Sequence, residues 1–417
     1  MVDVTNITEL TAALVDGNAG ATINVASGDY EVTQPLVVPA GATLKGASVM
    51  QAIYQATGMR ANPPPSRLKA ATTLVGDIIR LSDGSTLEGM IIEDVESGTA
   101  NQRAGNLVAV TSTQPGDRIS ALIQSCELVN PNPSNALPRG PIGRALLVVT
   151  NNPDDGARLT VTLRRSVIRA PGNGSGVFAI NFAPRGRVFL QLSRNQIGGG
   201  LDANGGVSRP APVTGAHTHI LSDRNRYQSD GADTPAAVGW QLNGGSNPPV
   251  SFFTPAYTRG NSLTIRSYRD TIDGFRTGIV AAGGWRPFEA GGPVSYCCAD
   301  IDVENLGLED LHIPFRFAGA KAGLSDDPAP PTFAPGDDNL LRVTGSPFWA
   351  TVGALGPQQS VLDRSSLRHG AAERGGDLPS PGVGNRLELY GVSFNGEHDL
   401  GMFEEFYCGP RFDSSGP

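Results

Sequence analysis

Carboxylate side chains gather in three short segments between residues 230 and 310. The segments contain Asp230 and Asp233, then Asp273, then Glu309 and Asp310. Two carboxylates about 5–10 Å apart can carry out glycoside hydrolysis, because crowding raises the pKa of one of them and makes it a general acid. The same oxygens would suit Ca²⁺, a hard cation that prefers oxygen ligands. We therefore expect acid–base chemistry here without a cofactor, and Ca²⁺ binding is the alternative.

Several other side chains near these acids could complete such a site. The candidate base is His312, and the candidate substrate-binding side chains are Arg276, Arg316, Trp285, Gln241, Asn243 and Asp310. An arginine could neutralise a uronate, and the tryptophan ring offers a platform for a sugar. Because side chains alternate along a strand, Gln241, Asn243 and Arg316 are expected to point outward.

Short strand-like segments must position these residues. Five of them align with one another: 119–128, 159–168, 188–197, 218–227 and 263–272. Their fifth residues stand 40, 29, 30 and 45 positions apart, and Val303 follows 36 positions later: Ile123, Leu163, Leu192, Ser222 and Ser267. A second, apolar strand follows most copies, as in 176–182, 237–243, 277–283 and 312–319. A helix-free repeat of this kind predicts a coil in which each strand pairs with its equivalent one turn below.

Two columns of the aligned repeats are polar. One is expected to be an inward ladder at a tight turn, with side chains that hydrogen-bond one another and the backbone; its members are Cys126, Ser166, Asn195, Asn225 and Asp270. The column before it contains Ser125, Arg165, Arg194, Arg224 and Arg269. Asp223 and Asp270 could separate these arginines, so we favour a solvated, salt-bridged turn face over a track for a polyanionic substrate.

Residues 20–46 resemble the first coil of the right-handed parallel β-helix proteins of the pectin-lyase-like superfamily. The matching residues are Thr22, Ile23, Val25, Gly28, Tyr30, Leu36, Val38, Gly41, Leu44 and Gly46. A short helix over residues 5–17, capped by Thr5 or Asn6, precedes them. The resemblance implies an all-β, single-stranded parallel β-helix of roughly ten coils. The chain would be one domain, with a cap over 1–19, coils over 20–400 and a tail over 401–417.

Long insertions follow the second strand in consecutive coils, at residues 244–261, 283–296 and 319–339. Since they leave at one position of the repeat, they should stack into a wall on one face. Long loops on one edge of a rigid scaffold often carry function. We therefore place the candidate site at the foot of this wall.

Two shorter motifs carry less weight. Arg139, Pro141 and Arg144 have the Arg-x-Pro-x-x-Arg spacing found in pectate-lyase-like enzymes. The partner motif Trp-x-Asp-His is missing, so we interpret the match as a coincidence. His217 and His219 could share one face of a strand, but a metal site needs a third ligand.

Composition and charge restrict the function classes. The net charge of −8 argues against nucleic-acid binding. No apolar run reaches the ~20 residues of a membrane span. The four cysteines show no zinc spacing and are expected to be buried thiols. The N-terminus has no signal-peptide pattern, which predicts a cytoplasmic protein or a secreted one whose signal has been removed.

Three functional hypotheses remain open. The first is a carbohydrate-active enzyme that cleaves or rearranges an oligosaccharide or polysaccharide, as a glycan lyase, a fructotransferase-like enzyme or a glycoside hydrolase. The second is a non-catalytic glycan-binding, tailspike-like or adhesin-like β-helix. The third is an intracellular isomerase or cyclase that acts on a small substrate. Such a protein could be a monomer or a homotrimer, because β-helix enzymes can place sites between subunits.

Overall fold

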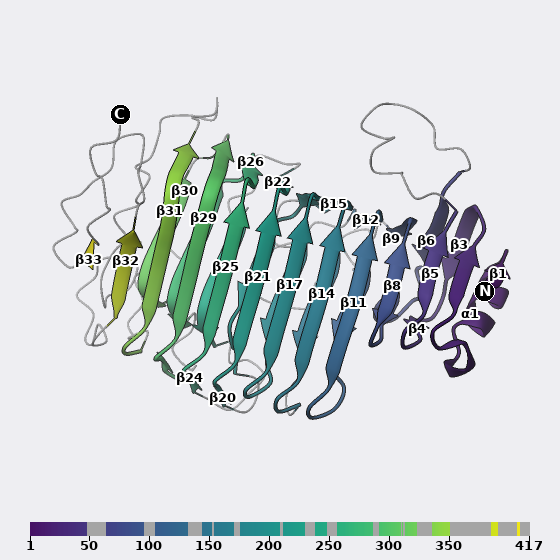
Figure 1. Ribbon diagram of the computed structural model, residues 1–417, viewed down its shortest axis with the longest axis horizontal. Helices are drawn as coiled ribbons and strands as arrows, with labels where there is room; N and C mark the ends of the chain where they lie inside the picture. The colour runs from purple at the N-terminus through teal and green to yellow at the C-terminus, as the bar shows by residue number, and fades with distance from the viewer. Residues whose placement is uncertain are drawn as a thin grey trace.

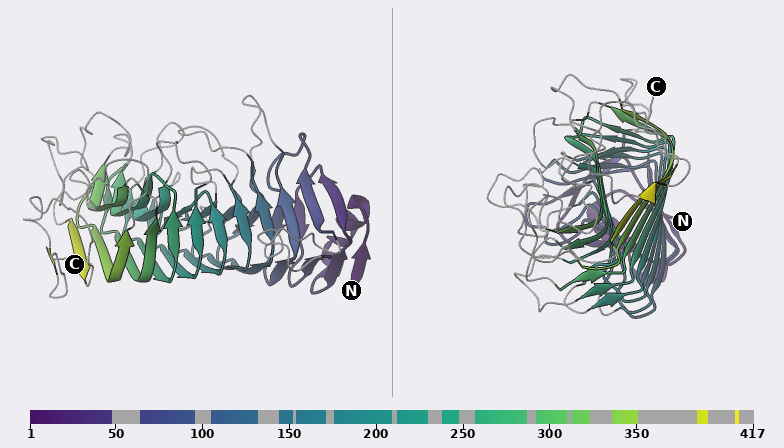
Figure 2. Two further views of the ribbon diagram at one scale, coloured as in Figure 1. Left: turned by 90° about the horizontal axis from the view of Figure 1, so that it is seen from above. Right: turned by 90° about the vertical axis from the view of Figure 1, so that its left-hand side faces the viewer.

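A computed structural model describes most of the chain. The described residues are 1–47, 64–95, 105–131, 144–151, 154–170, 176–208, 212–229, 238–247, 257–286, 292–309, 311, 313–322, 336–350, 385–390 and 407–408. Successive coils stack into an elongated body, with the N-terminus at one end (Figure 1). Strands of successive coils superimpose when the body is seen end-on (Figure 2). The predicted parallel β-helix is confirmed.

Three runs of parallel strands, one strand per coil, form the walls of this body. The front sheet, which faces the viewer in Figure 1, consists of β1 (Val2–Val4), β2 (Thr22–Val25), β5 (Thr43–Gly46), β8 (Ser85–Glu88), β11 (Arg118–Gln124), β14 (Arg158–Arg164), β17 (Arg187–Ser193), β21 (His217–Asp223), β25 (Ser262–Tyr268), β29 (Cys298–Glu309), β31 (Leu340–Ala350), β32 (Arg386–Tyr390) and β33 (Tyr407–Cys408). The side sheet consists of β3 (Gly28–Val32), β6 (Ser66–Ala70), β9 (Met90–Glu93), β12 (Glu127–Val129), β15 (Val167–Arg169), β18 (Gln196–Gly198), β22 (Arg226–Gln228), β26 (Thr271–Asp273) and the end of β29.

The back sheet follows the side sheet in each coil. It consists of β4 (Leu36–Val38), β7 (Ile79–Leu81), β10 (Val108–Thr111), β13 (Leu146–Thr150), β16 (Val177–Asn181), β19 (Leu201–Asn204), β23 (Val238–Ser246), β27 (Thr277–Arg286) and β30 (Ile313–Ala322). A short fourth sheet joins β20 (Val213–Thr214), β24 (Thr258–Arg259) and β28 (Val294–Ser295).

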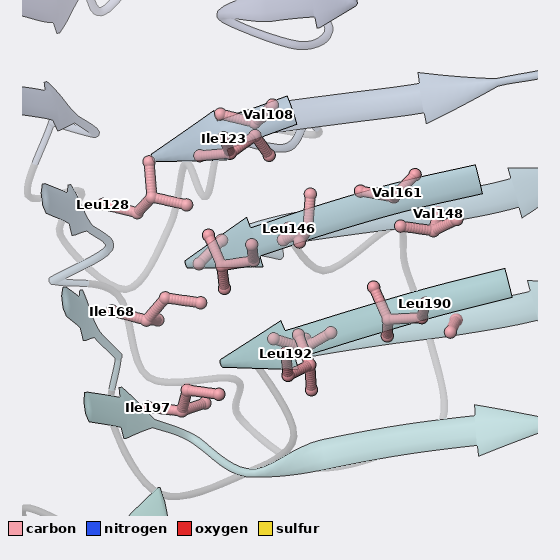
Figure 3. Close-up of a cluster of buried hydrophobic side chains, with 14 of the residues drawn as sticks. Val108, Ile123, Leu128, Leu146, Val148, Val161, Ile168, Leu190, Leu192 and Ile197 are labelled. Carbon is pink, nitrogen blue, oxygen red and sulfur yellow. The ribbon is translucent and has the colours of Figure 1, made fainter. Parts of the chain in front are cut away.

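The register between coils matches the alignment made from the sequence. Ile123 pairs with Leu163, Leu163 with Leu192, and the series continues through Ser222 and Ser267 to Val303. Alternate residues of every strand therefore point inward together. The resulting core is continuous along the body, and Figure 3 shows one section of it, with side chains from all three sheets. Each fully buried leucine, isoleucine or valine contributes roughly 1.5–3 kcal/mol.

A helix caps the N-terminal end of this core. It is α1 (Ile7–Ala13), shorter than the 5–17 predicted, and a 3₁₀ turn follows at Asp16–Asn18. Asn6 is the N-cap, since its side chain accepts a hydrogen bond from the Glu9 backbone nitrogen at 2.9 Å. Leu10 and Ala13 bury the apolar face of the helix.

The predicted inward ladder is confirmed bond by bond. The first four ladder residues each donate their backbone N–H to the ladder side chain one coil further on. The distances are 3.1 Å from Cys126 to Ser166, 2.9 Å from Ser166 to Asn195, 2.9 Å from Asn195 to Asn225 and 2.7 Å from Asn225 to Asp270. The residue before each ladder position has a positive φ, from 51° at Arg165 to 56° at Arg194. This left-handed residue makes the sharp bend between the front and side sheets.

The arginine column at this bend is only partly salt-bridged. Arg224 pairs with Asp223 at 3.7 Å, as expected. The prediction that Asp270 neutralises Arg269 is wrong, because the Asp270 carboxylate points inward and accepts hydrogen bonds from Asn225 and Ser267. Arg269 instead lies over the Tyr268 ring, with 4.8 Å between Cζ and the ring centroid.

The back-sheet strands run further into the predicted insertions than expected. β23, β27 and β30 end at Ser246, Arg286 and Ala322, and residues 248–256, 287–291 and 323–335 lie outside the described residues. Glycines allow this extension, because a Cβ at Gly244 or Gly283 would lie 2.4–2.6 Å from backbone atoms of neighbouring strands. The described part of the chain contains no helix long and apolar enough to span a membrane.

Candidate active site on the back sheet

The structure brings two of the predicted carboxylates together. Asp273 and Glu309 occupy the same position of consecutive coils, at the ends of β26 and β29, and are register partners. Asp273 is 7% exposed, and its Oδ2 accepts a hydrogen bond from Arg226 Nη2 at 2.6 Å. This hydrogen bond raises the pKa of Arg226, and the charges of Asp273 and Glu309 add to the shift. This arginine therefore holds a carboxylate pair on the outer edge of the side sheet.

The other predicted site residues divide between two places. Gln241 and Asn243 face outward from β23, because Trp240 and Leu242, which alternate with them along the strand, lie in the core. Arg276 is exposed in the turn between β26 and β27, and Trp285 is half-buried near the end of β27. The remaining four lie outside the described residues, as does the side chain of Arg316, whose backbone belongs to β30: Asp230, Asp233, Asp310 and His312.

A second group of polar side chains surrounds Gln241 and Asn243 on the outer face of the back sheet. Asp202 of β19 is the register partner of Gln241, and Asn204 is the partner of Asn243. The Asn204 Nδ2 donates a hydrogen bond to Asp202 Oδ1 at 3.2 Å. Neither Asp202 nor Asn204 was among the site residues predicted from the sequence. The aligned coils do contain one sign that Asp202 is unusual. It is an acid at a position where other coils have the apolar residues Leu147, Phe178 and Val280.

The environment of Asp202 changes its acidity. Burial raises the pKa of Asp202 to about 6, against the opposing effects of the nearby Arg144 charge and the Asn204 hydrogen bond. A carboxyl group with such a pKa exchanges its proton close to neutral pH, as a general acid or base must. Asp202 is therefore the described carboxyl group best suited to proton transfer on this face.

Arg144 is held beside Asp202 by an aromatic ring. Its Cζ lies 4.4 Å from the centroid of the Phe178 ring, and Phe178 is the register partner of Asp202 in the preceding coil. Burial lowers the pKa of Arg144, and the charge of Asp202 opposes this shift. Arg144 is the last residue of the Arg-x-Pro-x-x-Arg match, which we interpreted as a coincidence. The structure gives this residue a place beside an acid, while Arg139 and Pro141 lie outside the described residues.

Two amide atoms in this group lack a protein partner. Asn204 and Asn243 are 4% and 1% exposed, and within the described part of the chain Asn204 Oδ1 and Asn243 Nδ2 make no hydrogen bond. Leaving a buried polar atom unpaired costs about 1–3 kcal/mol. An acceptor and a donor on neighbouring coils suit a hydroxyl group, which can donate to one and accept from the other. Unpaired polar atoms of this kind are expected where a ligand or a water completes the structure.

An apolar surface borders the polar group on the side of the earlier coils. Val149, Ile180 and Val207 form a separate buried cluster outside the main core, and the half-buried Leu147, Phe178 and Phe182 lie against it. The back sheet thus presents an apolar patch followed by Asp202, Asn204, Gln241 and Asn243. Ligand sites commonly combine an apolar floor with a few converging polar groups.

Neither the cysteines nor the histidines form a metal site in the described residues. Burial raises the pKa values of the Cys126 and Cys297 thiols to about 12, so both are unreactive structural residues, as predicted. His217 and His219 do share one face of β21, with ring centroids 6.2 Å apart. No cluster of three or more histidine, cysteine, aspartate or glutamate side chains suited to a metal ion occurs among the residues described.

The fold and its coil-to-coil register define the molecule as a parallel β-helix protein. No family model and no curated protein sequence matches the chain. Among solved structures, the chain is similar to a PL6 family polysaccharide lyase from Pseudopedobacter saltans. The two are 11% identical, the match covers 88% of this chain and 92% of the other, and the TM-score is 0.23. Because this score is low, the similarity does not bear on the function of this chain.

Proposed function

We propose that the protein is a carbohydrate-active enzyme that cleaves a uronate-containing polysaccharide, with Asp202 as the acid–base residue. The observation that supports this proposal is the group formed by Asp202, with its pKa of about 6, the adjacent Arg144, and the unpaired amide atoms of Asn204 and Asn243. The amides would bind sugar hydroxyls, and the arginine would bind the uronate carboxylate.

This arrangement fits β-elimination better than hydrolysis. The Asp202 carboxylate would accept the C5 proton of the uronate, while Arg144 stabilises the enolate that forms. The electron pair then forms the C4=C5 double bond as the C4–O bond breaks, and the leaving oxygen takes up a proton. Hydrolysis needs a second carboxyl group. Among the described residues, Arg144 is the one charged group that shifts the pKa of Asp202.

The Asp273–Glu309 pair supports a second candidate, a glycoside hydrolase. Parallel register makes these two residues neighbours about 4.8 Å apart at the backbone. Side-chain rotation can bring their carboxyl groups to the roughly 5–5.5 Å that retaining enzymes use. This is the site predicted from the sequence. Asp273 already hydrogen-bonds Arg226, so Glu309 would act as the general acid in this alternative.

A glycan screen with two readouts tests these proposals. Ultraviolet absorbance reports the unsaturated product of elimination, and reducing-end release reports cleavage of either kind. We expect the wild type to give the absorbance with an acidic polysaccharide and Asp202→Asn to lose roughly 10²-fold or more in kcat/KM. Asp302→Asn is the matched control, because Asp302 is exposed on the front sheet.

Three outcomes would contradict the elimination proposal. Asp202→Asn could retain activity, which would remove Asp202 from the mechanism. Reducing ends could appear without absorbance and disappear in Glu309→Gln, which would establish the hydrolase instead. Absence of turnover on every acidic glycan would favour the hypothesis of a non-catalytic glycan-binding protein.

A further inference from the structure

The outer face of the front sheet carries a concentration of positive charge in three consecutive coils. Segments 118–125, 158–165 and 187–194 cover β11, β14, β17 and the bend residue after each strand. They contain six exposed arginines and no acidic residue: Arg118, Arg158, Arg164, Arg165, Arg187 and Arg194. The whole chain has a net charge of −8, so this is a positively charged surface on a protein that is negative overall.

The arginines form two rows along the axis of the body. Arg118, Arg158 and Arg187 begin their strands and are register partners across the three coils. Arg165 and Arg194 occupy the bend at the opposite edge of the sheet, in consecutive coils. The coils are about 4.8 Å apart. The strands between the rows face the viewer in Figure 1.

No carboxylate neutralises these rows within the described residues. Arg164 donates to Gln124 Oε1 at 2.9 Å, and Arg187 donates to the Gly215 carbonyl at 3.0 Å. Both partners are neutral. Like charges in adjacent coils repel one another, which destabilises the protein unless an anion lies between them. The next coil differs, because Arg224 there has the Asp223 carboxylate.

A shallow hollow lies on the same face, over β8, β11, β14 and β17. Its volume is about 390 Å³, and its polar lining comes from Ser85, Thr86, Ser120, Thr162, Arg164, Gln191 and Ser193. Hydroxyl and amide groups can exchange hydrogen bonds with sugar hydroxyls. Phe189 is the one aromatic residue of β11, β14 and β17, and its face is covered by the His219 ring, 5.3 Å away and nearly parallel. Stacking platforms for single-stranded nucleic acid use several aromatic rings, whereas these three strands carry a single ring that already stacks on His219.

We propose that this arginine surface is a second binding site for an acidic polysaccharide, which lies across the coils along the axis. Carboxylate or sulfate groups of the glycan would neutralise the two rows, and the hollow would hold a sugar ring. The site is on the front sheet, whereas Asp202 is on the back sheet, so the surface would hold the polymer while cleavage takes place elsewhere. The choice of a glycan rests on the proposed function, but the charge complementarity does not.

Binding measurements on a charge-matched pair of triple variants test this proposal. Arg118→Gln/Arg158→Gln/Arg187→Gln removes one row, and the control Lys69→Gln/Arg80→Gln/Arg259→Gln removes three exposed charges elsewhere. Both are made in the Asp202→Asn background, so that no glycan is cleaved. The probes are labelled polygalacturonate, heparin, neutral dextran and the single-stranded DNA poly(dT), and the readout is Kd at low and moderate salt.

We expect the row variant to bind polygalacturonate or heparin roughly tenfold more weakly and the control to stay within about twofold of its parent. Binding should weaken as salt rises, and dextran should not bind. Unchanged affinity in the row variant, equal binding of dextran, or tighter binding of poly(dT) than of both acidic glycans would overturn the proposal. Turnover that survives Asp202→Asn would contradict the proposed function alone, because the affinities for uncleaved heparin are measured independently.

Discussion

The side-chain oxygen of Asn225 accepts two hydrogen bonds from Asn195 in the preceding coil, from the backbone nitrogen and from Nδ2, each at 2.9 Å. Asn225 Nδ2 in turn donates to the Leu192 carbonyl at 3.0 Å. The ladder therefore satisfies backbone groups that the sharp bend removes from the sheets. Its contribution to stability can be measured.

Replacing Asn225 by alanine should destabilise the protein by at least about 2 kcal/mol. The substitution leaves the Asn195 nitrogen and the Leu192 carbonyl buried without partners, and each such group costs about 1–3 kcal/mol. Urea unfolding followed by circular dichroism measures the change. Asn24→Ala is the control, because Asn24 lies on the outer face of β2. Equal losses in the two variants would contradict a special role for the ladder.

Asp270 should make the protein less stable as the pH rises. Burial raises the pKa of this carboxyl to about 6 in the folded protein, compared with about 3.9 when unfolded. The folded state therefore binds the proton more tightly, and the stabilisation is complete below pH ~4 and lost as the pH rises through ~6. Asp270→Asn should raise the unfolding free energy by up to about 3 kcal/mol at pH 8 and change it little at pH 4. A destabilisation of equal size at both pH values would refute this.

Close backbone approach requires glycine at position 283. A Cβ there would lie 2.5 Å from the carbonyl carbon and oxygen of Leu340 and 2.6 Å from the Gly319 oxygen. Gly283→Ala should therefore cost about 1–3 kcal/mol through backbone displacement. Gly17→Ala is the matched control, since a Cβ at Gly17 meets nothing within 4 Å. Thermal unfolding measures the stability of both variants. If Gly283→Ala is as stable as the wild type, the neighbouring strands can move apart to accommodate a Cβ without a cost in stability.

The pH dependence of activity should follow the ionisation of Asp202. As a base, Asp202 must be ionised, so kcat/KM should rise as the pH passes ~6, where the pKa of this group lies. Arg144→Gln removes the charge that lowers this pKa and should shift the rise to higher pH. The control Arg118→Gln should leave the midpoint unchanged. An activity that falls over this range would assign Asp202 the role of an acid.

Arg226 should stabilise the folded protein through Asp273. Arg226→Gln leaves a nearly buried carboxylate without its partner and should cost about 1 kcal/mol, since the guanidinium itself is half exposed. The double variant Arg226→Gln/Asp273→Asn should recover part of this loss, because the unpaired charge is removed. Urea unfolding of the complete cycle gives the coupling energy. A coupling of zero would show that the 2.6 Å contact does not stabilise the protein.

The coil-to-coil arrangement could be predicted because it depends on local patterns. Alternating apolar residues determine which side chains point inward, and the spacing of the repeated segments predicts the register from Ile123 to Val303. The same register places Asp273 beside Glu309. The lengths of the back-sheet strands were not predictable in this way, because they depend on glycine contacts with the front sheet.

The identity of the candidate acid depended on tertiary structure. Asp202 is one of many aspartates in the sequence, and its pKa is raised because other segments remove water from it, an effect that the nearby Arg144 charge only partly opposes. The arginine surface is similar. The sequence showed one column of arginines, but only the folded sheet aligns both rows and leaves them without an ion pair among the described residues. Local periodicity therefore determined the fold, whereas desolvation and long-range charge, which only folding creates, determined where its chemistry can occur.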